Sequence, residues 1–493
     1  MITRGLWAFS ALVCFSILLL AGCRDRPLME PGQDQPLMVI TRAGPLTYDE
    51  ESVPTETDVE AVIATGLEHD LVTAFAADLG VSVQFVPMPT HKISAALRSH
   101  QGHLAAAWLG PLEDTSLVAG PPITDSLDFV IQNEQSLPVR RLDQLSGKTI
   151  NVIAGSWQAR TLHSLENELG IQVKENPAHD ALSLMADVAN QTIEFALVDK
   201  ATLSIGLNYY PNIETALPLG SPYPIAWNFP INGSSELQEK ASAFLTKIAE
   251  NGELKRILDR YLGHLERLGR LDNALFIERI RTVLPRFKPD FMKAQEETGL
   301  DWRLLAALAY QESRWDPLAT SRTNVRGIMM LTEETADALG VENRLNPSQS
   351  ILAGARYFQK LREQIPLTMP EPDRTWLAMA AYNIGLRHLK AGRAFAQRNG
   401  LNPDSWYEMK KALPWFARST GKGRGGEAII MTENVRLLYG TLQRFESMNA
   451  TQSWSMLGNM GKPDRKKAKL PPPGAGLRSK QRTAHPPKKT NPQ

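Results

Sequence analysis

The spacing of apolar residues predicts a region of alternating strands and helices at the start of the chain. Residues 37–41 (LMVIT) and 81–86 (VSVQFV) are short and rich in β-branched residues, which predicts strands, and residues 66–79 carry a helical pattern between them. A strand, a helix and a strand at this spacing predict a mostly parallel α/β unit. The order then repeats, with strands predicted at 147–154, 171–173 and 194–198 and helices at 156–169 and 181–190. Two α/β lobes fit this repetition better than one long sheet.

Helical patterns replace the strand patterns after about residue 270. They lie at 273–283, 287–298, 301–314, 348–364 and 375–387. This change predicts a second domain that is mostly α. The expected fold class is therefore multidomain, with a two-lobed α/β domain followed by a mostly α domain.

The amino terminus reads as an export signal. A basic start precedes an apolar run that ends in small residues, which is typical of a secretory signal peptide over residues 1–22. The alternative, an uncleaved anchor helix, is weaker because the run is short for a membrane span. Leu20-Ala21-Gly22-Cys23 resembles the bacterial lipobox, which implies that Cys23 is lipidated and begins the mature chain. Arg24 after it implies sorting to the outer membrane, with the protein facing the periplasm. Residues 23–36, rich in proline and charge, are expected to form a tether.

Composition removes several classes of function. The 54 Lys and Arg residues nearly balance 53 Asp and Glu residues, and with export this makes a nucleic-acid partner unexpected. Both cysteines lie within the first 23 residues, so a disulfide framework and thiol catalysis are excluded from the body of the protein. The nine histidines contain no HExxH motif, so we expect no metal site and no cofactor. Residues 453–493 are basic and rich in proline, and predict a disordered tail.

The strongest candidate chemistry lies on the predicted helix 301–314. Glu312 follows Leu308 at i, i+4 spacing on the apolar stripe, and Pro317 prevents the helix from continuing far. A carboxyl there meets an apolar wall and the negative end of the helix dipole, and both raise its pKa. Glu312 is therefore predicted to be an acid. The alternative is a solvated ion pair with Arg303 or Arg314.

The first domain resembles a known family. The segments LMVITRAGPLTYDEE, GLEHDLVTAFAADLGVSVQFV, AAAWLG and LSGKTINVIAGS resemble, in order, the solute-binding proteins of the periplasmic amino-acid-binding family, over residues 37–266. The resemblance implies two lobes that close over a small ligand, such as a cell-wall peptide. Such proteins usually hold the ligand's α-carboxylate with an Arg in the first lobe, but residues 101–139 contain no Arg or Lys. A different ligand, or a scaffold retained without one, stays open.

Three motifs in the second domain resemble another family. Glu312-Ser313 with Pro317, Gly327-Ile328-Met329 and the run AYNIG at 381–385 are similar, in order and spacing, to the signature of lytic murein transglycosylases of the soluble-transglycosylase, goose-lysozyme-like class. We assign residues 270–450 to this catalytic domain. The whole layout, with a lipoprotein signal and a solute-binding-like domain, resembles the membrane-bound members of this class. The fused architecture motivates the hypothesis that the first domain regulates the second.

The resemblance assigns roles to individual residues. Glu312 would be the only catalytic acid and base, and Ser313 would help to hold the sugar's acetamido group or the reacting centre. The turn from Gly327 to Met329 would line the groove. Tyr382 and Asn383 would position substrate or support Glu312.

A late family motif pairs a Glu with a Tyr four residues further on. Glu427 fits this motif as a further substrate contact, but Met431 takes the Tyr place, which implies that one groove contact differs. Met330 likewise stands where many relatives have Gln. Tyr310 and Trp315 could stack on sugar faces or lie in the core.

The expected reaction follows from a single carboxyl group. Ordinary glycosidases need a second carboxylate to activate water or to attack the sugar, and no second one is evident in these motifs. The resemblance implies cleavage of the β-1,4 bond between N-acetylmuramic acid and N-acetylglucosamine in peptidoglycan with a 1,6-anhydro product, so the enzyme is expected to be a lyase. The alternatives are a lysozyme-type hydrolase on the same scaffold and a non-enzymatic murein- or solute-binding lipoprotein.

Overall fold

The computed structural model describes residues 28–53, 61–112, 114–420 and 425–451. The predicted signal peptide, Cys23 and the basic tail lie outside the described residues. By its internal contacts the chain divides into two compact units, one running to Ile277 and including the end of the last helix from Phe445, the other spanning Glu278–Arg444. No helix in the described ranges combines the length and apolar character needed to cross a membrane.

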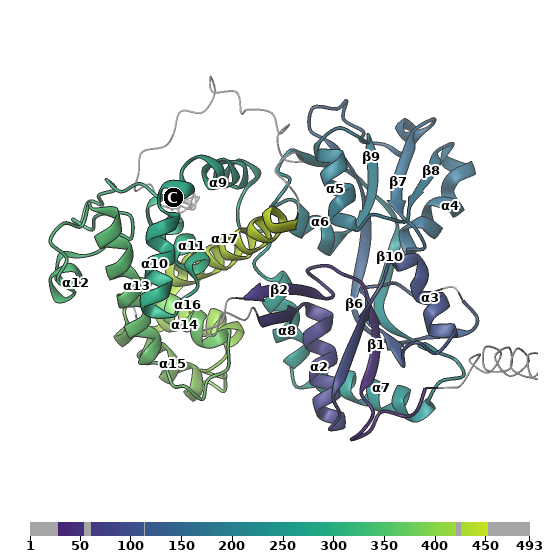
Figure 1. The fold of residues 1–493 in the computed structure, drawn as a ribbon, viewed down its shortest axis with the longest axis horizontal. Coiled ribbons are helices and arrows are strands. Elements are labelled where there is room, and N and C mark those ends of the chain that lie inside the picture. Colours follow the sequence, from purple (N-terminus) through teal and green to yellow (C-terminus); the bar gives the residue numbers. More distant parts are fainter. Residues whose placement is uncertain (1–27, 54–60, 113, 421–424, 452–493) are drawn as a thin grey trace, which may run out of the picture. The chain divides into compact units, whose positions relative to one another are not determined.

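The first unit is built on a mixed sheet of eight strands in the order β4-β1-β5-β10-β6-β9-β7-β8 (Figure 1). The strands are β1 (Leu37–Thr41), β4 (Val83–Pro87), β5 (Leu104–Ala105), β6 (Leu117–Asn133), β7 (Thr149–Ile153), β8 (Gln172–Asn176), β9 (Phe195–Asp199) and β10 (Ile213–Pro230). A separate antiparallel pair is formed by β2 (Asp49–Val53) and β3 (Ala61–Thr65). The helices are α2 (Leu67–Leu79), α3 (Thr90–Arg98), η1 (Leu142–Leu145), α4 (Trp157–Leu169), α5 (Ala181–Ala189), α6 (Lys200–Gly206), α7 (Ser235–Glu250) and α8 (Glu253–Leu262).

The two lobes share the long central strands β6 and β10, which extend from one lobe into the other in Figure 1. In one lobe β1 pairs in parallel with β4 and β5, and in the other β7 pairs in parallel with β8 and β9. The central pair of β6 and β10 is antiparallel. The prediction of two lobes with parallel strands is therefore right for the outer strands. The two lobes nevertheless share one long sheet, which the sequence did not favour, because the central pair belongs to both.

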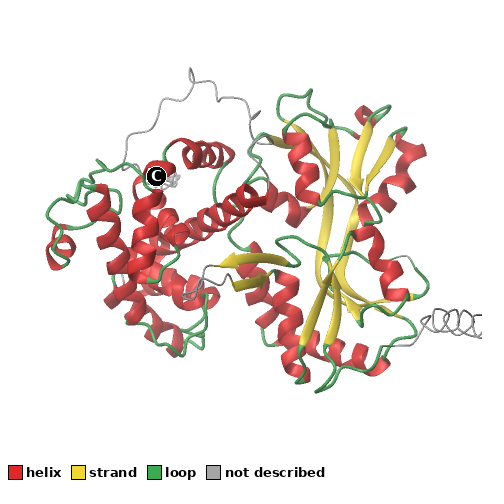
Figure 2. Cartoon of the chain, in the orientation of Figure 1, coloured by secondary structure: helices red, strands yellow, loops and turns green. Residues whose placement is uncertain are grey.

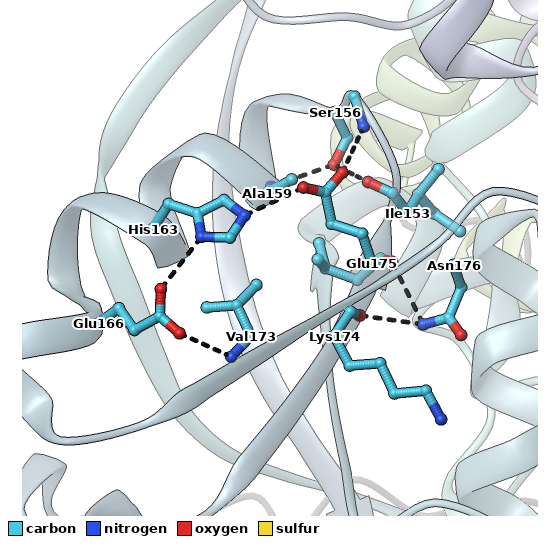
Figure 3. A network of polar contacts seen from close by, with 11 residues as sticks. Ile153, Ser156, Ala159, His163, Glu166, Val173, Lys174, Glu175 and Asn176 are labelled. Carbon is cyan, nitrogen blue, oxygen red and sulfur yellow. Dashed lines mark hydrogen bonds and ion pairs between the residues drawn. The ribbon is translucent and has the colours of Figure 1, made fainter.

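A cluster of polar contacts fastens α4 to β8 in the second lobe (Figure 3). The ring of His163 lies between two carboxylates, at 3.2 Å from Glu166 and 3.0 Å from Glu175. The Gly155 amide donates to Glu175 at 3.0 Å, and the Val173 amide donates to Glu166 at 3.3 Å. The hydrogen bonds of the His163 ring with Glu175 and then with Glu166 raise the pKa of His163. The cluster fixes the start of α4, which faces the junction of the lobes.

The described part of the predicted tether is not extended. Gly32 and Gln35 exchange two backbone hydrogen bonds, and the ring of His103 lies 2.9 Å from the carbonyl of Met29. This stretch therefore makes a turn against the first unit.

The second unit is helical (Figure 2). In its described residues the only strand-like pairings are isolated bridges. Its helices are η2 (Leu284–Arg286), α10 (Lys288–Thr298), α11 (Trp302–Ser313), α12 (Glu333–Ala338), α13 (Pro347–Glu363), α14 (Asp373–Ile384), α15 (Leu386–Arg398), α16 (Trp406–Thr420) and α17 (Gly425–Thr451), and α9 (Arg270–Thr282) crosses the boundary between the units. The helix predicted to run through residue 387 ends at Ile384, because Gly385 takes φ 82° and separates α14 from α15.

Candidate active site

Glu312 lies in the last turn of α11, on a helix whose preceding residues form the core of the unit. Leu305, Leu308 and Ala309 are fully buried. The helix ends because Arg314 adopts the left-handed conformation with φ 55°. The apolar stripe and the place of Glu312 near the helix end are as the sequence predicts.

The Glu312 carboxyl group is neutral at pH 7 because its surroundings disfavour charge. Glu312 as a residue keeps some exposure, yet burial raises its pKa from 4.5 to about 8. Among the described residues no hydrogen bond or ion pair joins it to Arg303 or Arg314, and Arg303 instead pairs with Asp301 at 2.7 Å. The predicted raised pKa is confirmed, and the alternative of a solvated ion pair is not what the structure contains.

Two hydroxyl groups hold successive carbonyls of the turn that faces α11. The Ser313 hydroxyl donates to the Ile328 carbonyl at 2.7 Å, and it also lies 3.1 Å from the Ala309 carbonyl. The Tyr382 hydroxyl, from α14, donates to the Met329 carbonyl at 2.9 Å. Three motifs far apart in the sequence are thereby tied into one site beside Glu312.

The turn from Gly327 to Met329 packs against α13 and against Arg344, which precedes this helix. Gly327 has φ 86°, and a Cβ atom there would lie 1.9 Å from the Arg344 carbonyl oxygen, so only glycine fits. Met329 is fully buried, with its side chain over Gly354 and its amide donating to the Ser350 hydroxyl at 3.3 Å.

The expectation that Met329 lines the groove needs a correction. Its side chain is in the core, so only its backbone carbonyl takes part in the site. Gly327 is also buried, and its contribution is the shape of the turn.

Tyr382 is both a support and an electrostatic neighbour of Glu312. Burial first, and then the charge of Glu312, raise the pKa of Tyr382 well above 10, so its hydroxyl remains a donor. Its ring lies against the half-buried Tyr357 of α13, with centroids 5.4 Å apart. Asn383 follows Tyr382, and its buried Oδ1 has no hydrogen-bond partner among the described residues.

Two aromatic residues expected as possible sugar platforms belong to the core. Trp315 is 1% exposed, and its indole N–H donates to the Ala306 carbonyl at 2.8 Å. Tyr310 packs edge-on against it, with centroids 4.8 Å apart. Trp315 and Met330 both have positive φ, at 58° and 50°, so the chain is strained just after Glu312 and just after the supporting turn.

Glu427 lies in the first turn of α17 with an exposed side chain. It is not part of the hydrogen bonds that tie Ser313 and Tyr382 to the turn. Further along α17, Met431 is buried and Asn434 donates to Gln311 of α11 at 3.2 Å. Helix α17 thus contacts α11 through Asn434.

Sequence reasoning missed the residues that support the turn: Arg344, Ser350, Gly354 and Tyr357. The signal available was weak, because small residues four apart on a helix, as at 350 and 354, indicate close packing without naming the partner. In the described ranges, no group of three or more His, Cys, Asp or Glu side chains is arranged to hold a metal ion.

Comparison with known proteins gives two domain families and a set of full-length relatives. Residues 46–264 match the bacterial extracellular solute-binding proteins, family 3, and residues 290–404 match the transglycosylase SLT domain. A membrane-bound lytic murein transglycosylase F of Methylobacillus flagellatus is 41% identical over 445 residues, covering 87% of this chain and 93% of that protein. Proteins of the same name from Nitrosospira multiformis and Pseudomonas syringae are 40% and 36% identical, covering 87% and 93% of this chain and 90% and 93% of the relatives.

Solved structures resemble part of the chain. An ancestral arginine-binding protein bound to arginine is 21% identical with a TM-score of 0.40, covering 46% of this chain and 97% of that one. The GluR0 ligand-binding core in complex with L-glutamate is 15% identical with a TM-score of 0.39, covering 47% of this chain and 100% of that one.

Proposed function

This chain belongs to the membrane-bound lytic murein transglycosylase F family, and from that premise we propose that Glu312 serves alone as the acid and the base of its reaction. The protein is a lytic transglycosylase, a lyase that acts on peptidoglycan. The observation that carries the proposal is a carboxyl group with a pKa of about 8 and no hydrogen-bond partner among the described residues. Such a group arrives at the substrate carrying its proton.

The proposed reaction uses the Glu312 carboxyl group twice, first as an acid and then as a base. Glu312 gives it to the glycosidic oxygen between N-acetylmuramic acid and N-acetylglucosamine, and the C1–O bond breaks as positive charge develops on the muramoyl ring. The carboxylate then takes the proton of the muramoyl C6 hydroxyl, whose oxygen closes on C1. The product is a 1,6-anhydromuramoyl end, and no water is consumed. Glu312 ends the cycle protonated, as it began.

We propose different roles for the residues around Glu312. Ser313 and Tyr382 act as positioning residues, because their hydroxyl groups fix the carbonyls of the turn. The free Oδ1 of Asn383 suits an N–H donor such as the acetamido group of a sugar. Gly327 shapes the groove through its backbone, and exposed Glu427 contacts the glycan from α17.

The test is the variant Glu312→Gln, which keeps the shape of the side chain and removes the transferable proton. Proton transfer of this kind contributes about 10²- to 10⁴-fold, so release of fragments from purified murein should fall by at least about 100-fold. Glu363→Gln, an exposed residue of α13, is the matched control and should retain full activity. Fragments from the wild type should be 18 Da lighter than hydrolysis products, and reducing ends instead would favour a lysozyme-type hydrolase.

The remaining organisation of the chain is also a proposal. We propose that residues 1–22 are removed, that lipidated Cys23 anchors the protein in the outer membrane facing the periplasm, and that residues 23–36 act as the tether; the relatives are named membrane-bound. Residues 37–266 would form the regulatory domain, residues 270–450 the catalytic domain, and residues 453–493 a basic tail. Cys23→Ser should move the protein from the membrane fraction to the soluble periplasmic fraction.

The partners follow from the two domains. The transglycosylase domain binds peptidoglycan, and the solute-binding domain indicates a small ligand. We propose that this ligand is a cell-wall peptide and that nucleic acid is not a partner.

A further inference from the structure

Two contacts join the lobes of the first unit across their junction. The indole of Trp108, which follows β5 in one lobe, donates a hydrogen bond to Asp199 at the end of β9 in the other, at 3.2 Å. A Cβ atom on Gly155, which follows β7, would lie 2.7 Å from the Cα atom of His91 at the start of α3. Backbone from one lobe therefore meets backbone from the other, and the structure shows the lobes in a closed arrangement.

Two carboxyl groups lie side by side at this junction. Asp128 of β6 and Asp199 of β9 occupy opposite positions of an antiparallel pair, and both are buried, with 1% and 4% of their surfaces exposed. Side chains at opposite positions share one face of the sheet, with Cβ atoms about 5 Å apart. Like charges placed there repel each other. The pair is therefore sensitive to whether both groups are ionised.

The cations near the junction do not balance this pair. Arg42 lines the same cavity as Asp199, and Arg160 of α4 donates to the Pro111 carbonyl in the loop that follows β5. Among the described residues, neither arginine forms an ion pair with Asp128 or Asp199. Two negative charges at these positions would therefore face each other without an ion-paired cation.

The donors that reach Asp128 are neutral. Its Oδ1 accepts from the Tyr223 hydroxyl of β10 at 2.8 Å and from the Gln158 amide of α4 at 2.9 Å. Burial raises the pKa of Asp128 from 3.8 to about 7, while these hydrogen bonds oppose the rise and the charge of Asp199 adds to it. Burial, and then the charges of Asp199 and Asp128, also raise the pKa of Tyr223, which therefore stays protonated. Near neutral pH, Asp128 is the group of this cluster that changes charge.

A loop of the first lobe covers this cluster. The Tyr223 ring stacks on Trp157 of α4, with centroids 5.0 Å apart. A Cβ atom on Gly110 would lie 2.8 Å from the Tyr223 ring and 3.1 Å from the Trp157 ring, so the backbone of the loop packs directly on the stack. The same loop carries Trp108, which holds Asp199. Separation of the lobes would lift the loop and admit water, in which a charged carboxylate is far more stable than when buried.

We propose that Asp128 couples the arrangement of the lobes to pH: the closed arrangement requires its protonated form, and loss of that proton to water favours the open one. An ionised Asp128 is buried beside a second carboxylate when the lobes are closed, and hydrated when they are open. A ligand enclosed by the lobes would then be released more readily as the pH rises. The proposal concerns the first unit alone, and it stands whether or not that unit regulates Glu312.

The direction of the effect follows from linkage. Because the pKa of Asp128 is higher in the closed than in the open arrangement, its protonated form stabilises the closed arrangement fully below about pH 4. This stabilisation is lost as the pH rises towards 7, where the closed form ionises too, and the open-to-closed ratio then levels off.

Distances between spin labels on the two lobes of the full-length protein test the proposal. Both native cysteines lie within the first 23 residues, and serine replaces them. Labels are then attached through Ala77→Cys on α2 and Asn167→Cys on α4, which are both exposed positions. Double electron–electron resonance from pH 5 to pH 9 gives the open-to-closed ratio. We expect this ratio to rise at least about tenfold between pH 5 and pH 7, and less than about twofold between pH 8 and pH 9.

Variants identify the group that titrates. Asp128→Asn keeps an acceptor for Tyr223 and Gln158 but cannot ionise, so its open-to-closed ratio should stay at or below the wild-type value at pH 5. Asp125→Asn is the matched control, an exposed aspartate on the same strand, and should keep the wild-type response. Tyr223→Phe removes a donor that lowers the pKa of Asp128, so the ratio should level off at a higher pH. That shift remains measurable if Asp128→Asn fails to fold.

Several outcomes would overturn the proposal. They are a ratio that does not change with pH in the wild type, lobes that open as the pH falls, and a full response in folded Asp128→Asn. His91→Gln tests the histidine at the junction and should also keep the response, so a response lost there and kept in Asp128→Asn would assign it to His91 instead. None of these results bears on Glu312, because no murein is present.

Discussion

Glu68 in the first unit and Glu312 in the second both have a pKa raised by burial, but their carboxyl groups have different hydrogen-bond partners. Burial raises the pKa of Glu68 to about 7 and that of Glu312 to about 8. Glu68 lies at the start of α2 and receives one N–H donor on each oxygen, while Glu312 lies at the end of α11 with no such donor among the described residues. Donors lower the pKa of a buried carboxyl and lock its orientation. Their absence leaves Glu312 protonated and available, which is what a catalytic acid requires.

The largest expected effect is at the turn from Gly327 to Met329, which Ser313 and Tyr382 hold through its carbonyls. Gly327→Ala would place a Cβ atom 1.9 Å from the Arg344 carbonyl at φ 86°, and we expect destabilisation of more than about 3 kcal/mol with loss of activity. The measurement is urea unfolding. Gly299→Ala is the control, since its φ of 67° costs about 1 kcal/mol but no atom lies within 4 Å of the new Cβ. Similar losses in the two variants would contradict the steric argument.

The second prediction concerns the pH dependence of catalysis. Glu312 must be protonated to act as the acid, so kcat/KM should be level below about pH 8 and fall about tenfold per pH unit above it. Rates on a soluble glycan fragment between pH 5 and 10 measure this limb. A limb that begins near pH 4.5 would mean that Glu312 enters the reaction ionised, as if it had donors like those of Glu68.

The third prediction compares how the thermal stability of the protein depends on pH when Glu312 or Glu68 is replaced. A carboxyl whose pKa is raised by folding stabilises the protein below pH 4.5, and this contribution is lost as the pH rises through the folded value. Glu312→Gln should therefore gain Tm relative to the wild type up to about pH 8, and Glu68→Gln should stop gaining near pH 7. We expect the pH-dependent gain to be a few degrees for Glu312 and smaller for Glu68. Calorimetry at pH 5, 7 and 9 measures it, and equal gains would remove the distinction.

The smallest effect is expected at Tyr382. Tyr382→Phe removes the hydrogen bond to the Met329 carbonyl and should cost about 1–3 kcal/mol, with a partial loss of activity. Tyr357→Phe is the control, because its hydroxyl makes no hydrogen bond in the described ranges, and it should change stability by less than about 0.5 kcal/mol. Equal effects of the two variants would show that ring packing, rather than the hydroxyl, supports the turn.

Local patterns predicted β1, β4, β7, β8 and β9 and half of the described α-helices, but not the centre of the sheet. β1 is predictable because five consecutive apolar and β-branched residues fill it. β6 is not among the predicted strands. Its sequence, LVAGPPITDSLDFVIQN, contains glycine and two adjacent prolines, and prolines remove hydrogen-bond donors from a strand. Its seventeen residues are strand because β10 pairs with them, with several shifts of register along the way. That pairing joins segments too far apart for local patterns to show.

The same division holds at the candidate site. The chemistry of Glu312 could be predicted, because helical spacing alone puts it on an apolar stripe near a helix end. The burial of Met329 could not, because it depends on the contact with Gly354 of α13.

The path of β10 sets the order in which the first unit can assemble. β5 receives its pairing with β10 only through Asn228, and the strands of the other lobe all precede that residue. As the polypeptide emerges from its amino end, the lobe of β7, β8 and β9 has all its own strands while the lobe that starts the chain still lacks one. The first lobe to be synthesised is therefore the last to be finished.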